Sequence, residues 1–97
     1  MRKIIYPGTF DPIHNGHIDI ANRVSTLFDE LEFVVAVNSE KKPLFSINTR
    51  LDLIKESVKH IENVKVSQFQ GLVVDHADKT GSIAIIRGLG HVSDFEF

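Results

Sequence analysis

The sequence predicts an α/β fold, a Rossmann-like parallel sheet with helices on both faces. Apolar segments of strand length alternate with amphipathic segments of helix length in the order βαβαβαβ, without repeats or low-complexity tracts. Residues 31–37 (LEFVVAV) form a nearly continuous apolar run rich in β-branched side chains, which is typical of a strand covered on both faces. Strands and helices in this order form a parallel sheet with right-handed crossovers.

The strands are expected where short apolar runs occur. They fall at 4–6, 31–37, 64–69 and 83–86, with Pro7 ending the first run. The helices are expected where apolar residues recur at helical spacing. The first, over 16–29, is marked by Ile20, Val24, Leu27 and Phe28, and the second by Leu51, Ile54, Val58 and Ile61. Ser46 or Asn48 caps the second helix, and a third helix over 72–80 ends at Gly81.

Length and composition restrict the class of protein. Ninety-seven residues allow one domain, 1–97, with one core. The net charge of −2, without a basic stripe, argues against a nucleic-acid partner. The absence of cysteine excludes disulfides and thiolate metal sites. No apolar run is long enough for a membrane span or a signal peptide, so we expect a soluble cytoplasmic protein.

The loop after the first strand, residues 8–17 (GTFDPIHNGH), carries the strongest functional signal. A strand, a glycine-containing turn and a helix start present backbone N–H groups and a positive helix end to an anion. Thr9, His14 and His17 supply polar side chains at the same place. This combination indicates a site for the phosphates of a nucleotide.

Two further loops are expected at the same edge of the sheet, because ligands of parallel sheets bind beyond the carboxyl ends of the strands. Lys41 and Lys42 follow the second strand, and Arg87 follows the fourth. We interpret Lys41 as a phosphate contact and Lys42 as a solvated charge. Arg87 suits bidentate phosphate binding, with a plain surface arginine as the alternative.

The sequence allows two interpretations of several residues. His14 either orients the loop or contacts the same phosphates. The apolar residues around Gly71 either line a slot for an organic substrate arm or belong to the core; they are Phe69, Leu72 and Val73. A zinc site at His14 and His17 is not expected, because no third ligand lies nearby. The remaining histidines are expected at the surface or at helix caps; they are His60, His76 and His91.

Three segments together resemble bacterial phosphopantetheine adenylyltransferase, a family of the nucleotidylyltransferase superfamily with the T/HxGH motif. Residues 6–17 (YPGTFDPIHNGH) resemble the family signature. Residues 41–45 (KKPLF) resemble its second loop, and 86–89 (IRGL) with 94–96 (DFE) resemble its third. The resemblance extends from Met1 to Phe97 and implies a single nucleotidylyltransferase-like domain, the N-terminal portion of the family fold.

The resemblance implies a reaction and a set of site residues. ATP and 4′-phosphopantetheine would give dephospho-coenzyme A and pyrophosphate with Mg²⁺, in a hexamer of identical chains. Thr9, His17, Lys41 and Arg87 would be the catalytic residues, with Lys41 between the phosphates of the two substrates. The ATP site would comprise Thr9, Phe10, His17, Gly88, Leu89 and Gly90. The phosphopantetheine site would comprise Thr9, Lys41, Phe69, Leu72, Val73 and Arg87.

The chain departs from the family pattern at two places. Gly90 stands where the family usually has a second arginine, three residues after the first. The family chain also continues well beyond the DFE segment, whereas this sequence stops at Phe97, at the start of an apparent helix. We therefore expect a truncated chain. The alternatives are a non-catalytic domain that binds a nucleotide or phosphopantetheine, and a sister nucleotidylyltransferase with another phosphorylated acceptor.

Overall fold

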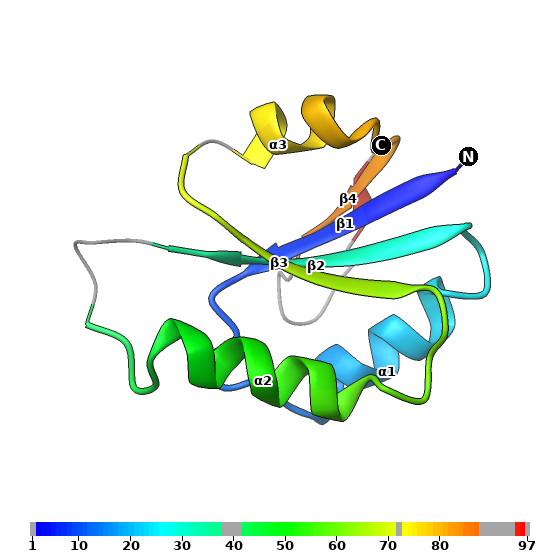
Figure 1. The fold of residues 1–97 in the computed structure, drawn as a ribbon. Helices are drawn as coiled ribbons and strands as arrows, with labels where there is room; N and C mark the ends of the chain where they lie inside the picture. Colours follow the sequence, from blue (N-terminus) through cyan, green and yellow to red (C-terminus); the bar gives the residue numbers. More distant parts are fainter. Residues whose placement is uncertain (1, 38–41, 72, 88–94, 97) are drawn as a thin grey trace.

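The computed structural model of the chain describes residues 2–37, 42–71, 73–87 and 95–96 (Figure 1). One sheet forms the centre of this part of the chain, in the strand order β3-β2-β1-β4-β5. Its strands are β1 (Lys3–Gly8), β2 (Glu30–Ala36), β3 (Val64–Phe69), β4 (Ala84–Ile86) and β5 (Phe95–Glu96). The first four strands are parallel, and β5 pairs antiparallel with β4.

Helices cover both faces of the sheet, as the sequence predicts. Figure 1 shows α1 and α2 on one face and α3 on the other. The helices are α1 (Asn15–Val24), α2 (Ile47–Ser57) and α3 (Val73–Thr80). The α/β fold class and the βαβαβαβ order are therefore confirmed, with β5 added. No helix in the described ranges is long and apolar enough to cross a bilayer.

The strand β2 separates two apolar clusters. Phe33 is fully buried on the α1 and α2 face, where it packs with Ile4, Val24 and Ile54. Val34 points to the other face, where it packs with Ile5 and Ala77 of α3. A strand buried on both sides has no polar face to alternate with its apolar one, which explains the continuous run in the sequence.

Two expected boundaries are wrong at the start of the chain. The strand β1 continues through Pro7 to Gly8. Proline is tolerated there because β4 pairs with β1 only at Ile4 and Ile5, so β1 has one hydrogen-bonded neighbour at Pro7. The helix α1 ends at Val24, five residues before the expected end.

The early end of α1 has a local cause. The hydroxyl of Ser25 donates to the Asn22 carbonyl at 3.1 Å, and that of Thr26 donates to the Arg23 carbonyl at 2.8 Å. These bonds occupy carbonyls in the last turn of the helix. Leu27, expected on the apolar stripe, is consequently 58% exposed.

The other elements lie close to their expected positions. Ser46 is the N-cap of α2, and its Oγ accepts a hydrogen bond from the Thr49 N–H at 3.2 Å. Gly81 follows α3 with a φ of +71°, the left-handed conformation that favours glycine at a helix end. The expected helix start near Phe97 is wrong, because Phe95 and Glu96 form β5 along the edge of β4.

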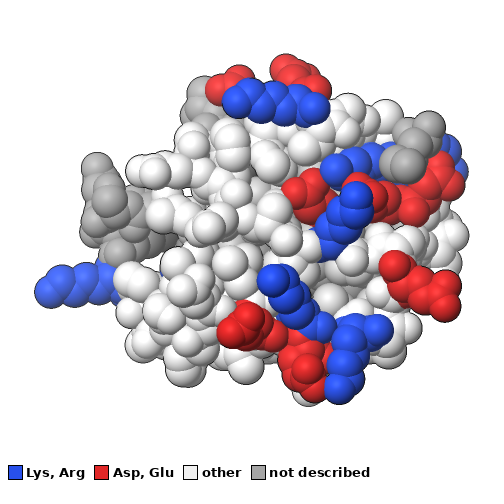
Figure 2. Space-filling model, viewed as in Figure 1, with Lys and Arg blue, Asp and Glu red and all other residues white. Residues whose placement is uncertain are grey.

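Charged side chains of both signs are interspersed on the surface. On the face drawn in Figure 2, Lys and Arg side chains lie beside Asp and Glu side chains, and neither sign covers a large area by itself. The ion pairs Arg23–Asp19 and Lys59–Glu56, at 3.2 and 2.6 Å, are of this kind.

Candidate functional site

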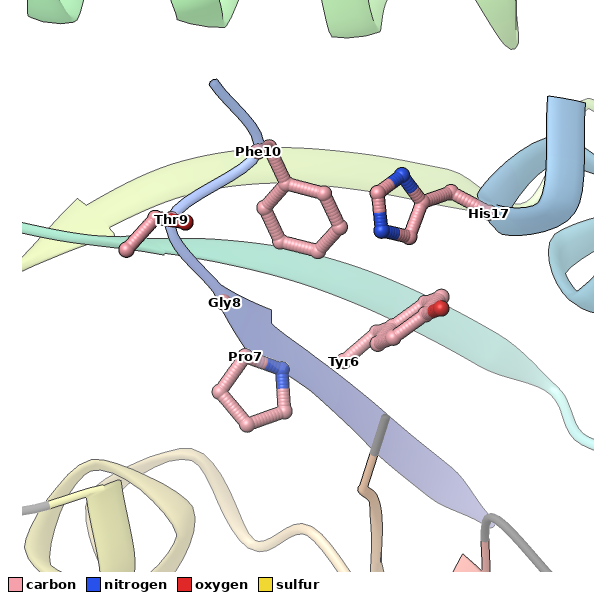
Figure 3. A pocket seen from close by; sticks show the side chains of 6 residues that line it. All are labelled: Tyr6, Pro7, Gly8, Thr9, Phe10 and His17. Atoms are coloured by element: carbon pink, nitrogen blue, oxygen red, sulfur yellow. The ribbon is translucent and has the colours of Figure 1, made fainter. Parts of the chain in front are cut away.

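A pocket lies where β1 ends and α1 begins. Tyr6, Pro7, Gly8, Thr9, Phe10 and His17 line it (Figure 3). Its volume of about 220 Å³ is below the roughly 300–1,000 Å³ of complete small-molecule sites. The described residues therefore enclose enough space for the phosphate part of a ligand, but not for a whole nucleotide.

The side chain of Phe10 anchors the loop rather than facing a ligand. Its exposed fraction is 3%, and its ring centre lies 5.3 Å from that of Tyr6 and 5.1 Å from that of Phe33. Its φ is +45°, which is uncommon for a residue other than glycine. The ring also passes close to Gly8, where an added Cβ would lie 3.1 Å from it. A contact of Phe10 with ATP would thus have to use its backbone.

His17 projects from the first turn of α1 toward the end of β1 (Figure 3). The His14 N–H donates to Nδ1 of His17 at 3.0 Å, and the Gly16 N–H donates to Nδ1 of His14 at 3.1 Å. This reciprocal pair is a capping box made of two histidines. Because Nδ1 of His17 accepts a hydrogen bond, the neutral ring carries its proton on Nε2.

The surroundings of His17 keep its ring neutral and fixed. Burial, together with the positive charge that His14 can carry, lowers the pKa of His17 to about 4. The His14 ring stacks on it at 3.7 Å between centres, and Phe10 meets it edge-on at 4.9 Å. At neutral pH the pocket therefore contains a preoriented, uncharged N–H donor. Such a donor suits an oxygen of a phosphate group.

His14 stacks on this donor, and Thr9 lines the same pocket. His14 is the N-cap of α1, which supports its role in orienting the loop. Thr9 is exposed at the pocket, and its carbonyl accepts a hydrogen bond from Nη1 of Arg50 at 3.0 Å. The hydroxyl of Thr9 thus belongs to a loop that α2 holds in place.

The other expected site residues are only partly described. Arg87 is exposed and follows β4, the neighbour of β1, so it emerges at the same edge of the sheet as Thr9. Lys42 is exposed, as expected. Outside the described residues lie Lys41, Leu72, Gly88, Leu89, Gly90 and His91.

Of the residues around Gly71, Phe69 is the one whose packing the structure describes. Phe69 is partly buried and packs against the apolar cluster beneath α3. Its ring centre lies 4.7 Å from that of His76. Val73 is the first residue of α3, and its side chain lies outside the described part of the chain.

A buried polar cluster beneath α3 corrects the expectation for His76. Its imidazole is 12% exposed, and its Nε2 lies 3.2 Å from a carboxylate oxygen of Glu32. The same carboxylate contacts Lys3 at 2.8 Å and accepts a hydrogen bond from Ser67. Burial raises the pKa of the Glu32 carboxyl, but hydrogen bonds from these partners hold the pKa below its ordinary value. His60, in contrast, is exposed and lies 2.8 Å from the Asn22 side chain.

Sequence reasoning missed Asp11 and Arg50, which connect the pocket loop to the segment before α2. A signal for Arg50 was present, because it continues the spacing of the buried α2 residues Ile54 and Val58. A charged residue on the apolar stripe of a helix indicates a buried contact. A corresponding signal for Glu32 was its position as the one charge inside the run 31–37.

The described side chains do not form a ready cage for a metal ion. No group of three His, Asp or Glu side chains that could hold a metal lies together in the described ranges. Both carboxylate oxygens of Asp11, the acidic residue of the loop, accept backbone hydrogen bonds. A Mg²⁺ ion at these residues would be held mainly by phosphates and water, as is usual for this ion.

Comparison with known proteins agrees with the fold. The model of the cytidylyltransferase-like family matches residues 5–97. The chain belongs to the cytidylyltransferase-like family. It also has the fold of a lipopolysaccharide core biosynthesis protein from Thermoplasma volcanium, with a TM-score of 0.70 and 27% identity over 95% of this chain and 80% of that one.

Relatives of higher identity share a single name. The chain is 54% identical to a phosphopantetheine adenylyltransferase of Caldanaerobacter subterraneus and 52% identical to those of Dictyoglomus thermophilum and Dictyoglomus turgidum. These matches include all 97 residues of this chain. The chain spans about three fifths of the length of these relatives, 59–61%.

Proposed function

We propose that the chain transfers the adenylyl group of ATP to 4′-phosphopantetheine, giving dephospho-coenzyme A and pyrophosphate. The observation that carries this proposal is the preoriented Nε2–H donor of His17 in a pocket of phosphate size. The same chain is 54% identical, over its own 97 residues, to 61% of a phosphopantetheine adenylyltransferase. That identity is twice the 27% found with the lipopolysaccharide biosynthesis protein, which favours phosphopantetheine as the acceptor.

The chemistry of the reaction matches these residue types. A phosphate oxygen of the acceptor, already anionic near neutral pH, attacks the α-phosphorus of ATP and displaces pyrophosphate. No general base is needed, so a histidine with a pKa of about 4 is no disadvantage. The site has to align two anions and stabilise charge that builds up on the phosphoryl oxygens.

Each expected site residue then has a role within the proposal. His17 donates Nε2–H to an α-phosphate oxygen, and Thr9 donates its hydroxyl to a neighbouring one. Lys41 lies between the phosphates of the two substrates, and Arg87 binds the acceptor phosphate in bidentate fashion. Mg²⁺ enters with the phosphates of ATP and neutralises part of their charge.

The remaining parts of the proposal depend on the resemblance. Phe69, Leu72 and Val73 contact the pantetheine arm. The backbone of Phe10 and the segment 88–90 contact ATP. The chain forms one nucleotidylyltransferase-like domain, 1–97, and an assembly of six chains in the cytoplasm is the expected setting.

The test is formation of dephospho-coenzyme A from ATP, Mg²⁺ and 4′-phosphopantetheine by the 97-residue chain. Removal of one preorganised donor costs about 10²–10³ in rate, so we expect His17→Ala to lower kcat by that factor. His60→Ala is the matched control, because His60 is an exposed histidine that bonds Asn22 and does not line the pocket.

Each outcome distinguishes one alternative. Equal rates for His17→Ala and the unmodified chain would refute the role of His17. Faster turnover with another phosphorylated acceptor would identify a sister nucleotidylyltransferase. ATP binding in calorimetry without any product would instead indicate a binding domain.

A further inference from the structure

We propose that Asp11 and Arg50 are positioning residues that fix the spacing between the loop proposed to bind phosphates and the segment that follows Lys41 in the sequence. The first segment is the pocket loop with Thr9, and the second is the stretch 42–46, which leads into α2. The inference rests on the proposed function. The contacts behind it connect parts of the chain more than 30 residues apart.

Asp11 binds the second segment through both of its oxygens. Oδ2 accepts a hydrogen bond from the Leu44 N–H at 2.6 Å, and Oδ1 accepts one from the Phe45 N–H at 2.9 Å. Hydrogen bonds to an ionised carboxylate are shorter and stronger than those between neutral groups. Both oxygens of Asp11 thus bind the backbone of the second segment.

Arg50 binds both segments at once. Its Nε donates to the Phe45 carbonyl at 3.1 Å, and its Nη1 donates to the Thr9 carbonyl at 3.0 Å. The planar guanidinium presents these donors in a fixed geometry that a lysine ammonium cannot reproduce. Phe45 is thus held at its N–H by Asp11 and at its carbonyl by Arg50.

The charge of Arg50 adds an electrostatic reason for the arrangement. The residue is 6% exposed, yet no carboxylate in the described ranges lies within 4 Å of its guanidinium. A buried charge without a counter-ion is costly. The guanidinium donates instead to backbone carbonyls, and one of them, that of Thr9, lies at the edge of the pocket. An anionic ligand in the pocket would therefore gain from the positive potential of Arg50.

The consequence is that the two segments keep one relative position. Lys41 lies three residues before Leu44 in the sequence, so the anchoring of Leu44 and Phe45 also limits how far Lys41 can move from Thr9. Transfer between two phosphates depends on such alignment, and a misplacement of about 1 Å can cost about 10²-fold in rate.

The first measurement tests the contacts themselves, by amide hydrogen exchange followed in NMR spectra. Asp11→Asn removes the charge and replaces one acceptor oxygen by an NH₂ group that cannot accept from an N–H. We expect the Leu44 and Phe45 amides to exchange at least ten times faster in this variant. Asp52→Asn is the matched control, because Asp52 is exposed on α2.

The second measurement tests positioning, by kcat and KM for adenylyl transfer and by ATP affinity in calorimetry. We expect Asp11→Asn and Arg50→Lys each to lower kcat by about ten- to a hundredfold, and Arg50→Lys to retain more ATP affinity than Arg50→Met. Ile54→Val, which trims a buried residue of α2, corrects for a general loss of stability. It should leave kcat within about twofold, since no contact of the two segments changes.

The outcomes separate this inference from the proposed function. Unchanged exchange in Asp11→Asn, or normal kcat and KM despite faster exchange, would overturn the positioning roles while leaving the reaction intact. The positioning roles would also be overturned if Asp11→Asn or Arg50→Lys lost no more kcat than an equally destabilised Ile54→Val variant. Absence of adenylyl transfer in the unmodified chain would refute the proposed function first and the positioning roles with it.

Discussion

The protonation of His17 should differ strongly from that of an ordinary histidine. Burial and the stacked His14 ring lower its pKa to about 4. With that pKa about one ring in a thousand is charged at pH 7, against about a quarter for the ordinary value near 6.5. We therefore expect the His17 resonances to titrate near pH 4.

The stability of the fold should respond in the corresponding direction. The folded state has the lower pKa, so between about pH 6.5 and pH 4 the unfolded chain binds more protons at this residue. The contribution of neutral His17 to stability is thus fully present above about pH 6.5 and declines as the pH falls toward 4. Urea unfolding followed between pH 7.5 and pH 4 measures this decline. The His17→Gln variant should show a smaller decline, because it lacks the contribution of His17.

The assay is a pH titration of the imidazole rings by proton and ¹⁵N NMR, which also reports the tautomer. We expect the Nε2–H form, because the His14 N–H donates to Nδ1. In His14→Ala that backbone donor remains while the second imidazole is lost, so the pKa of His17 should rise but stay below 6.5. A His17 pKa near 6.5 in the unmodified chain, or an Nδ1–H tautomer, would refute the reasoning.

Two further predictions concern Glu32, which lies beneath α3, and Gly71, which lies in the loop before α3. Glu32→Ala should lower the free energy of unfolding in urea by about 3 kcal/mol, because it removes one member of a buried ionic cluster. Glu56→Ala, in an exposed pair, should cost less than about 1 kcal/mol, and equal losses would contradict the burial argument. Gly71 has a φ of +132°, and an added Cβ would lie 3.2 Å from the Phe69 ring. Gly71→Ala should thus lower Tm more than Gly81→Ala, where φ is +71° and the space is open; the reverse order in thermal unfolding would contradict this.

The sequence predicts the order of elements well, because that order depends on local periodicity. Residues 31–35 of the apolar run are buried as expected, and residues 64–69 form β3 without a shift. The end of α1 could not be placed, because the apolar stripe continues past it to Leu27 and Phe28. The Ser25 and Thr26 hydroxyls decide that boundary, and hydropathy does not register them.

The site could be predicted only where it depends on residues close together in the sequence. The pocket loop and the strand before it are one continuous segment, so the strand, turn and helix start follow from residues 4–17 alone. The reciprocal cap between His14 and His17 could not be predicted, because it depends on how both rings are oriented. Arg50 and Glu32 bind residues 35 to 44 positions away in several cases, and no local pattern shows which partner a buried charge will find.

Because His17 is neutral, orientation of the phosphates and neutralisation of their charge have to come from different groups. An uncharged N–H donor gives direction to a phosphate oxygen but cannot neutralise it, and salt does not screen it as it screens a cation. In the proposed reaction, the neutralising charge would then come from Lys41, Arg87, Arg50 and Mg²⁺. Rising ionic strength should consequently weaken ATP binding through KM, whereas the rate factor lost in His17→Ala should stay the same. If the site relied on a charged imidazolium, rising ionic strength would instead weaken ATP binding and also reduce the rate factor lost in His17→Ala.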